Sequence, residues 1–179
     1  MKILYAASEA VPFCKTGGLA DVAGSLPAAL AAQGADVAVV LPLYQKVKEK
    51  FSDQLHFECY DYVDLAWRHS YCGLFSLQKD GVTWYFLDNE QYFDRSELYG
   101  YMDDGERFAF FSRAVVRMLG HLKFWPEVIH CNDWQTALVP IYLKDNGVRE
   151  ERFRTVRTVL TIHNIEYQGR YNPYILGDL

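Results

Sequence analysis

Several common features are absent from this sequence of 179 residues, and each absence excludes a class of protein. The four cysteines form no C-x-x-C pair and no histidine completes a zinc pattern, so no metal site is expected. No apolar run is long enough to span a membrane. The formal net charge of −5 disfavours non-specific binding to nucleic acid. We therefore expect neither a membrane nor a nucleic-acid partner.

The N-terminus carries no recognisable targeting segment. Met1 and Lys2 lead directly into an apolar run, without a secretory leader or a Ser/Arg-rich transit segment. Unpaired cysteines are typical of a reducing compartment. The expected location is the cytoplasm of a bacterium, or a plastid if a transit segment has been removed.

Three well-known site fingerprints are also missing. Gly17, Gly18 and Gly24 lack the G-x-G-x-x-G spacing of a dinucleotide site. Lys15 precedes the glycines, whereas a P-loop places its lysine after them. No G-x-S-x-G nucleophile elbow occurs. The sequence supports neither a nicotinamide-dependent enzyme nor a P-loop NTPase.

What is present indicates a globular α/β protein, because half of the residues are hydrophobic and 23% are charged. The apolar runs 2–7 and 36–42 predict buried strands, and 18–33 predicts the helix between them. Pro27 predicts a kink or a new helix start, and Gln33-Gly34 predicts the helix end. Strand, helix and strand form a right-handed βαβ unit.

The middle of the chain predicts an antiparallel ribbon. Residues 55–66, 70–78 and 82–87 alternate loosely between polar and apolar, and the turn signal at 79–81 joins the last two segments. Residues 88–104 predict a long surface loop. Its tyrosines, Tyr92 and Tyr99, could either stack on a ligand or be solvated.

The second half returns to helices and parallel strands. A helix is expected from about Gly105 to Gly120 with its Phe108/Phe111 stripe in the core, and strands at 128–131 and 155–162. Asp133 is expected to cap a helix over 134–144 that stops at Asn146-Gly147. The expected fold is a Rossmann-like, mostly parallel sheet with helices on both faces and an inserted antiparallel ribbon.

Three polar clusters each follow a predicted parallel strand. They span residues 15–21, 130–134 and 163–164. Ligands of open α/β sheets bind outside the carboxyl ends of the strands, so these clusters should line one crevice. This placement favours Lys15, Asp133 and His163 as functional residues. The alternatives are a helix cap at Asp133, a hydrogen-bonded structural histidine at His163 and a core histidine at His130.

The first cluster has the chemistry of an anion site. Gly17 and Gly18 let the backbone approach a ligand closely, and the following helix start offers free N–H groups. Lys15 adds a mobile positive charge. A phosphate is the expected ligand, and an ordinary turn with a solvated lysine is the alternative.

At this point the motifs can be compared with a known family. The chain resembles the N-terminal region of bacterial glycogen synthases and plant starch synthases over its whole length. The resemblance rests on residues 8–12 (SEAVP), 15–22 (KTGGLADV), 93–95 (FDR), 98–100 (LYG), 106–111 (ERFAFF), 130–137 (HCNDWQTA) and 161–169 (TIHNIEYQG).

The resemblance implies a retaining, two-Rossmann-domain (GT-B) glycosyltransferase. Such an enzyme moves glucose from ADP-glucose to the non-reducing end of an α-1,4-glucan, without a metal or another cofactor. Asp133 and His163 would surround the reacting glucose, and Lys15 would contact or lie beside the donor phosphates. The other implied substrate-binding residues are Gly17, Gly18, Asp21, Tyr99 and Asn164.

The family also implies a longer protein. Its members carry a second, nucleotide-binding domain, so residues 1–179 are interpreted as an incomplete N-terminal Rossmann-like domain without that C-terminal partner. We expect this chain alone to lack transferase activity and to expose apolar surface that permits self-association. A non-catalytic glucan-binding module and a synthase that uses UDP-glucose remain the alternatives.

Overall fold

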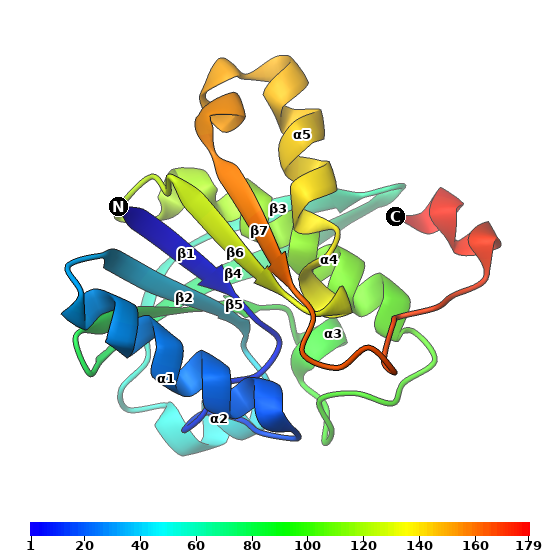
Figure 1. Ribbon diagram of the computed structural model, residues 1–179. Helices are drawn as coiled ribbons and strands as arrows, with labels where there is room; N and C mark the ends of the chain where they lie inside the picture. The colour runs from blue at the N-terminus through cyan, green and yellow to red at the C-terminus, as the bar shows by residue number, and fades with distance from the viewer.

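A computed structural model describes residues 1–179, in which seven strands form one sheet in the order β3-β4-β5-β2-β1-β6-β7 (Figure 1). The strands are β1 (Lys2–Ala6), β2 (Asp36–Pro42), β3 (His56–Leu65), β4 (Arg68–Lys79), β5 (Val82–Asp88), β6 (Val128–Asn132) and β7 (Arg157–Thr161). Strands β5, β2, β1, β6 and β7 are parallel, and β4 and β3 add an antiparallel ribbon at one edge. The predicted mixed α/β fold is confirmed.

Helices cover both faces of the sheet. They are α1 (Gly18–Ala32), α2 (Gln45–Phe51), α3 (Glu90–Phe93), α4 (Asp104–Met118) and α5 (Val139–Arg149), with 3₁₀ turns η1 (Leu119–His121), η2 (Trp134–Thr136), η3 (Glu151–Thr155) and η4 (Pro173–Asp178). Helix α1 lies in front of the sheet in Figure 1 and α4 behind it. This follows from right-handed crossovers, because α1 connects β1 to β2 in one direction along the sheet, whereas α4 lies in the connection from β5 to β6, which runs in the other direction.

The turn signals in the ribbon are confirmed. Asp80 and Gly81 both have positive φ, 53° and 74°, which is the pattern of a two-residue type I′ hairpin turn. Lys79 pairs with Val82 across it. The helix end at Gln33-Gly34 is also confirmed, since Gly34 has φ of 87° and its N–H donates to the carbonyl of Ala31.

A helix follows β6 as predicted, but its predicted bounds of about 134–144 are wrong. Residues 134–136 form the 3₁₀ turn η2, and α5 runs over Val139–Arg149. Pro140 fixes this start, because proline suits the first helical turn, where its missing N–H costs nothing. Gly147 lies inside the helix and is buried; a Cβ there would lie 3.3 Å from the side chain of Arg154. The glycine therefore provides close packing and does not stop the helix.

Other expectations need smaller corrections. Helix α1 continues through Pro27 without a new start. The expected loop over 88–104 contains the short helix α3, and α2 was not anticipated. Tyr92 is buried, so it cannot stack on a ligand; its hydroxyl donates to Glu106. The core stripe of α4 is confirmed, because Phe108 and Phe111 are both buried.

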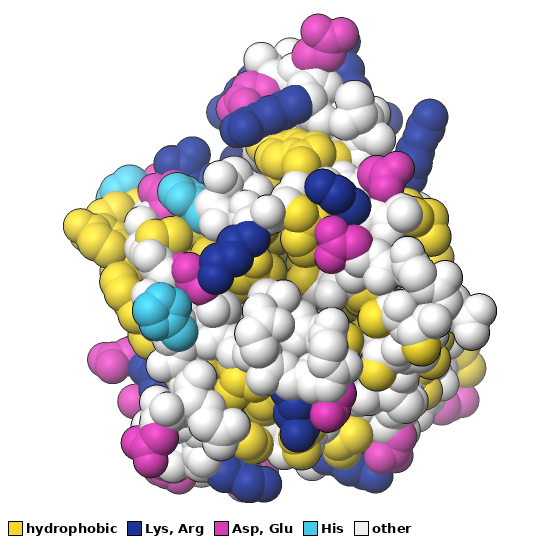
Figure 2. Space-filling model, turned by 90° about the vertical axis from the view of Figure 1, so that its left-hand side faces the viewer, with side chains coloured by type: hydrophobic (Ala, Val, Ile, Leu, Met, Phe, Trp, Pro, Cys, Tyr) yellow, Lys and Arg dark blue, Asp and Glu magenta, His cyan; other side chains and the backbone are white.

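Charged side chains of both signs are dispersed over the face of the molecule seen in Figure 2. Figure 2 shows acidic and basic groups interspersed on one face, with no large area of one sign. No helix has the length and apolarity that a bilayer crossing requires. At the β7 edge, apolar side chains are exposed, namely Val159, Leu160, Ile162 and Ile165.

Candidate functional site

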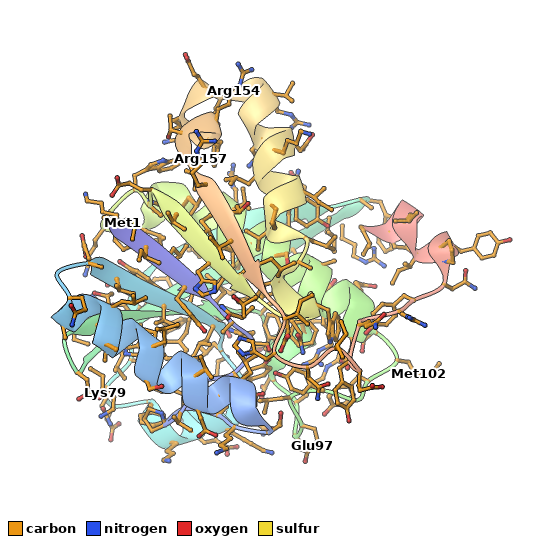
Figure 3. The ribbon with its side chains drawn as sticks, viewed as in Figure 1. Met1, Lys79, Glu97, Met102, Arg154 and Arg157 are labelled. Carbon is orange, nitrogen blue, oxygen red and sulfur yellow. The ribbon has the colours of Figure 1, made fainter.

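The strand order reverses between β1 and β6, and the predicted site lies at this point. In open α/β sheets the crevice at such a reversal, outside the carboxyl ends of the strands, is where ligands bind. The loops after β1, β6 and β7 all leave the sheet at this end (Figure 1). In Figure 3, Glu97 and Met102 of the α3–α4 loop lie at the same end, opposite Met1 and Arg157.

Asn132, the last residue of β6, connects the strands at the reversal. It is fully buried. Its Nδ2 donates to the carbonyls of Ala6 at 3.0 Å and His130 at 3.1 Å. Its Oδ1 accepts from the Tyr5 hydroxyl at 2.9 Å and faces His163 Nε2 at 2.9 Å. Residues from two strands, β1 and β6, and from the loop after β7 therefore meet at one amide.

This network assigns the tautomer of His163. Two carbonyls fix the amide nitrogen of Asn132, so the oxygen must face the imidazole. The hydrogen of a neutral His163 ring therefore sits on Nε2, and Nδ1 is left as an acceptor. Burial and the neighbouring His163 lower the pKa of His130 below its ordinary value of 6.5. His130 is half-buried beside Tyr5, with its Nε2 2.7 Å from Thr161 Oγ1.

Asp133 has an unusual backbone conformation. Its φ of 57° and ψ of −175° lie in a region that non-glycine residues rarely occupy, at a cost of roughly 1–3 kcal/mol. Its N–H donates to the Thr161 carbonyl at 2.8 Å, and its Oδ1 accepts from the His163 N–H at 2.7 Å. The expected helix cap at Asp133 is wrong, because its carboxylate makes no capping bond. The carboxylate instead joins the loops after β6 and β7.

The loop after β1 is organised by Glu9, which sequence reasoning missed. This buried carboxylate accepts from the Thr16 N–H, from the Thr16 hydroxyl at 2.9 Å and from the Gly17 N–H at 3.3 Å. Two of the amides expected to meet a phosphate are thus already bonded within the protein. Gly18 remains open, since a Cβ there would meet nothing within 4 Å.

Lys15 and Asp21 form an exposed ion pair. The Lys15 ammonium lies 2.7 Å from Asp21 Oδ1, and both side chains are about half exposed. An exposed pair of this kind contributes roughly 0–1 kcal/mol. An anionic ligand could therefore draw Lys15 away from Asp21 at little cost.

Tyr99 is held at the crevice by a buried clamp. Its hydroxyl donates to Ser8 Oγ at 2.7 Å. Burial, followed by the charge of Glu9, raises the pKa of Tyr99 well above its ordinary value. Arg107, fully buried in α4, donates to the carbonyls of Tyr92 and Leu98 on the same loop. Tyr99 is therefore a neutral, oriented hydroxyl.

A cavity of about 400 Å³ is lined by residues that come after Asp133 and after His163 in the sequence. Gly169 has φ of 59°, and a Cβ there would lie 2.5 Å from the ring of Trp134. This close approach places the loop after Asn164 across the indole. The lining residues are Trp134, Glu166, Tyr167, Gln168, Gly169, Arg170 and Tyr171. Trp134 belongs to the 130–137 segment, and the other lining residues belong to the 161–169 segment and its continuation, where sequence reasoning had selected only His163 and Asn164.

The structure brings some of the predicted residues into direct contact. The Asp133 carboxylate accepts a hydrogen bond from the His163 N–H. The Tyr99 hydroxyl donates to Ser8, and the next residue, Glu9, accepts from the Gly17 N–H. Lys15 and Asp21 contact each other but neither Asp133 nor His163. Asn164 is exposed, and its Oδ1 accepts from the Glu166 N–H at 3.0 Å. No group of three or more metal-ligating side chains is placed to hold a metal ion.

Comparisons with known proteins give close relatives over the whole chain. The chain is 50% identical over 179 residues to a glycogen synthase of Clostridium kluyveri, and 53% identical over 182 aligned positions to one of Lactococcus lactis subsp. lactis. Both alignments cover 100% of this chain and 38% of the relative. The chain thus spans little more than a third of the length of these relatives.

A solved structure shares the fold. The catalytic domain of starch synthase IV from Arabidopsis thaliana, bound to ADP and acarbose, matches with a TM-score of 0.85 and 30% identity. The match covers 98% of this chain and 36% of the plant protein. Residues 2–179 match the family described as the starch synthase catalytic domain. The chain therefore belongs to the starch synthase catalytic domain family.

Proposed function

We propose that this chain is the N-terminal wall of a glucosyltransferase that extends a glycogen-type glucan. The observation that carries the proposal is the bonded Asp133–His163 pair at the strand reversal of a chain that matches the family over residues 2–179. The donor is ADP-glucose, and glucose is added with retention to the non-reducing end of an α-1,4-glucan. The plant neighbour bound to ADP and acarbose, a nucleotide and a sugar ligand, supports this choice.

Each side of the crevice has a distinct role in this proposal. Asp133 and His163 bind and orient the transferred glucose, because the second oxygen of the Asp133 carboxylate and Nδ1 of His163 have no protein partner. Preorganised polar groups of this kind stabilise charge that develops in the transition state. Tyr99 and Asn164 contact the sugars at the edge of the site.

Lys15 binds the donor phosphates, helped by the open helix start at Gly18. The ligand displaces the weak Lys15–Asp21 pair, and Asp21 then faces the cleft. The Gly17 backbone N–H donates to Glu9, and Gly18 leaves room for the approach of the ligand. Replacing Gly18 with alanine meets no protein atom, so it should reduce donor use without lowering the stability of the fold.

The chain is proposed to act only with a second, nucleotide-binding domain of the same protein. Positioning and electrostatic contributions are divided between two walls, so one wall alone should give no transfer above a blank. The exposed apolar side chains at the β7 edge are the surface through which the isolated chain would self-associate.

The decisive experiment uses the full-length protein and measures transfer of labelled glucose from ADP-glucose and from UDP-glucose into glycogen. Lys15→Ala should weaken ADP-glucose use much more than it weakens glycogen binding, with Lys46→Ala as the matched lysine control. A preference for UDP-glucose would overturn the donor assignment. Loss of glycogen binding alone would identify a glucan-binding module instead.

A further inference from the structure

The β3–β4 ribbon carries an exposed row of aromatic side chains away from the crevice. Tyr62 pairs with Tyr71 and Tyr60 with Gly73, and alternate residues of a strand share a face, so these rings lie on one side of the ribbon. Tyr60 is 57% exposed and Tyr62 43%. We call this set the aromatic row; it consists of Phe57, Tyr60, Tyr62, His69, Tyr71 and Phe75.

The rings form a nearly continuous surface. Tyr60 and Tyr71 stack with centroids 5.8 Å apart at 29°, and Tyr62 stacks on His69 at 4.6 Å and 9°. Gly73 makes this possible, because a Cβ there would lie 2.5 Å from the Tyr71 hydroxyl. The glycine lets Tyr71 lie across the strand.

The core accounts for Phe75, which is half-buried and packs against it, but not for the exposed rings of the row. Helix α4 packs on the opposite face of the ribbon, where Val63 and Leu65 are buried. On the side of the aromatic row, α2 ends at Phe51, and its Lys48 reaches only as far as Asp88 of β5. Contiguous exposed apolar surface of this kind marks an interaction site.

The surroundings of the row favour an uncharged ligand. Nearby charges are paired within the protein: Asp64 with His69 at 2.6 Å, and Lys48 with Asp88 at 2.8 Å. A polar hollow of about 250 Å³ adjoins the edge of β3. It is lined by Asp61, Tyr62, Val63, Asp64, His69, Arg113, Arg117, Asn146 and Arg149. Flat rings beside hydrogen-bonding groups suit a molecule with C–H faces and a hydroxyl rim.

We infer that the aromatic row binds an α-glucan chain at a surface separate from the transfer site. The pyranose faces stack on the tyrosine rings, and the hydroxyls bond to side chains of the hollow. The choice of an α-1,4-glucan rests on the proposed function. Four strand spacings separate β3 from β1, roughly 19 Å, so only a long acceptor occupies both surfaces. A polymer then gains from the second contact through effective concentration.

A second copy of this chain is a poorer occupant. Strand β3 is the edge of the sheet, and it carries Glu58, Asp61 and Asp64. Charged side chains along an edge strand are a common protection against edge association. A register shift between Phe57 and Cys59 also interrupts the edge.

The test compares two double variants of the full-length protein. Tyr60→Ala with Tyr71→Ala removes the stacked rings, whereas Tyr60→Phe with Tyr71→Phe keeps them. Glycogen binding is measured by retardation in native gels that contain glycogen. The alanine variant should bind about tenfold more weakly, and the phenylalanine variant should bind as wild type does. Tyr174→Ala, which removes a tyrosine that is 90% exposed elsewhere, is the matched control.

Kinetics and oligomeric state complete the test. With the alanine variant, KM for glycogen should rise about tenfold, while KM for maltotriose and kcat stay unchanged. Unchanged retardation, or an equal rise of KM for both acceptors, would overturn the inference. So would a dimer in sedimentation equilibrium that the alanine variant abolishes. Tyrosine-dependent retardation without any glucose transfer would support the aromatic row and refute the proposed function.

Discussion

Replacing Asn132 with leucine should destabilise the protein strongly, although the two side chains have similar size. Two hydrogen bonds of the Asn132 side chain are fully buried, those to the Tyr5 hydroxyl and the Ala6 carbonyl. Each group left without a partner costs about 1–3 kcal/mol, and the added apolar burial returns about 1 kcal/mol. The expected loss of unfolding free energy is therefore about 1–5 kcal/mol, which lowers Tm by roughly 3–15 °C.

Urea unfolding followed by circular dichroism measures this loss, and calorimetry gives Tm. The matched control is Asn146→Leu, because Asn146 lies on α5 at the surface hollow and its side chain makes no hydrogen bond. An Asn132→Leu protein as stable as the control would refute the account of the amide network. An altered m-value would show that the substitution also changed the unfolded ensemble.

The same substitution tests the tautomer of His163. In the wild type, the Asn132 oxygen holds the ring hydrogen on Nε2. With leucine at position 132 the two nitrogens of the neutral ring become more nearly equivalent, so nitrogen NMR of the neutral ring should show a mixture of tautomers. A pure Nε2–H signature in the variant would contradict the assignment.

Three further predictions concern single residues. Because burial lowers the pKa of His130, the unfolded chain binds more protons than the native state below about pH 6.5, and the free energy of unfolding should fall on acidification. His130→Phe should reduce the difference in unfolding free energy between about pH 7 and about pH 5, as measured by urea titration. Gly169→Ala should drive a methyl group into Trp134, so its indole emission should shift and about 1–3 kcal/mol of stability should be lost; unchanged emission would count against the close approach. Arg107→Met should cost about 3–5 kcal/mol and speed amide hydrogen exchange at Leu98 and Tyr99, because it leaves the Asp104 carboxylate buried without its charged partner; exchange at the wild-type rate would argue against the clamp.

The parallel strands and the ribbon could be predicted because their signals are local. Continuous apolar runs mark strands buried on both faces, and Asp80-Gly81 is the residue pair that a type I′ turn requires. Once strands are placed, their carboxyl ends define one crevice without further information. This reasoning selected Asp133 and His163, which are bonded in the structure.

The residues that were missed act through tertiary contacts. Glu9 follows a strand like many surface acids, and only the return of Thr16 and Gly17 to its carboxylate explains its burial. Asn146-Gly147 has the composition of a helix stop, but the packing of Arg154 onto Gly147 overrides it. Tyr92 was placed on a loop because no periodicity covers it, whereas Glu106 holds its hydroxyl in the core.

The backbone of Asp133 shows why the site differs from the pattern that predicted it. A cap would have used ordinary extended torsions and a carboxylate bond to the next turn. The chain instead adopts a conformation of roughly 1–3 kcal/mol strain, held by the Thr161 carbonyl and the His163 N–H. Asp133→Gly would relieve that strain but remove the carboxylate. If the residue served only the fold, this variant would be as active as wild type, whatever the balance between the relieved strain and the lost bond to the His163 N–H. A variant that is stable but inactive would mean that the strain is tolerated because it places the carboxylate in the cleft.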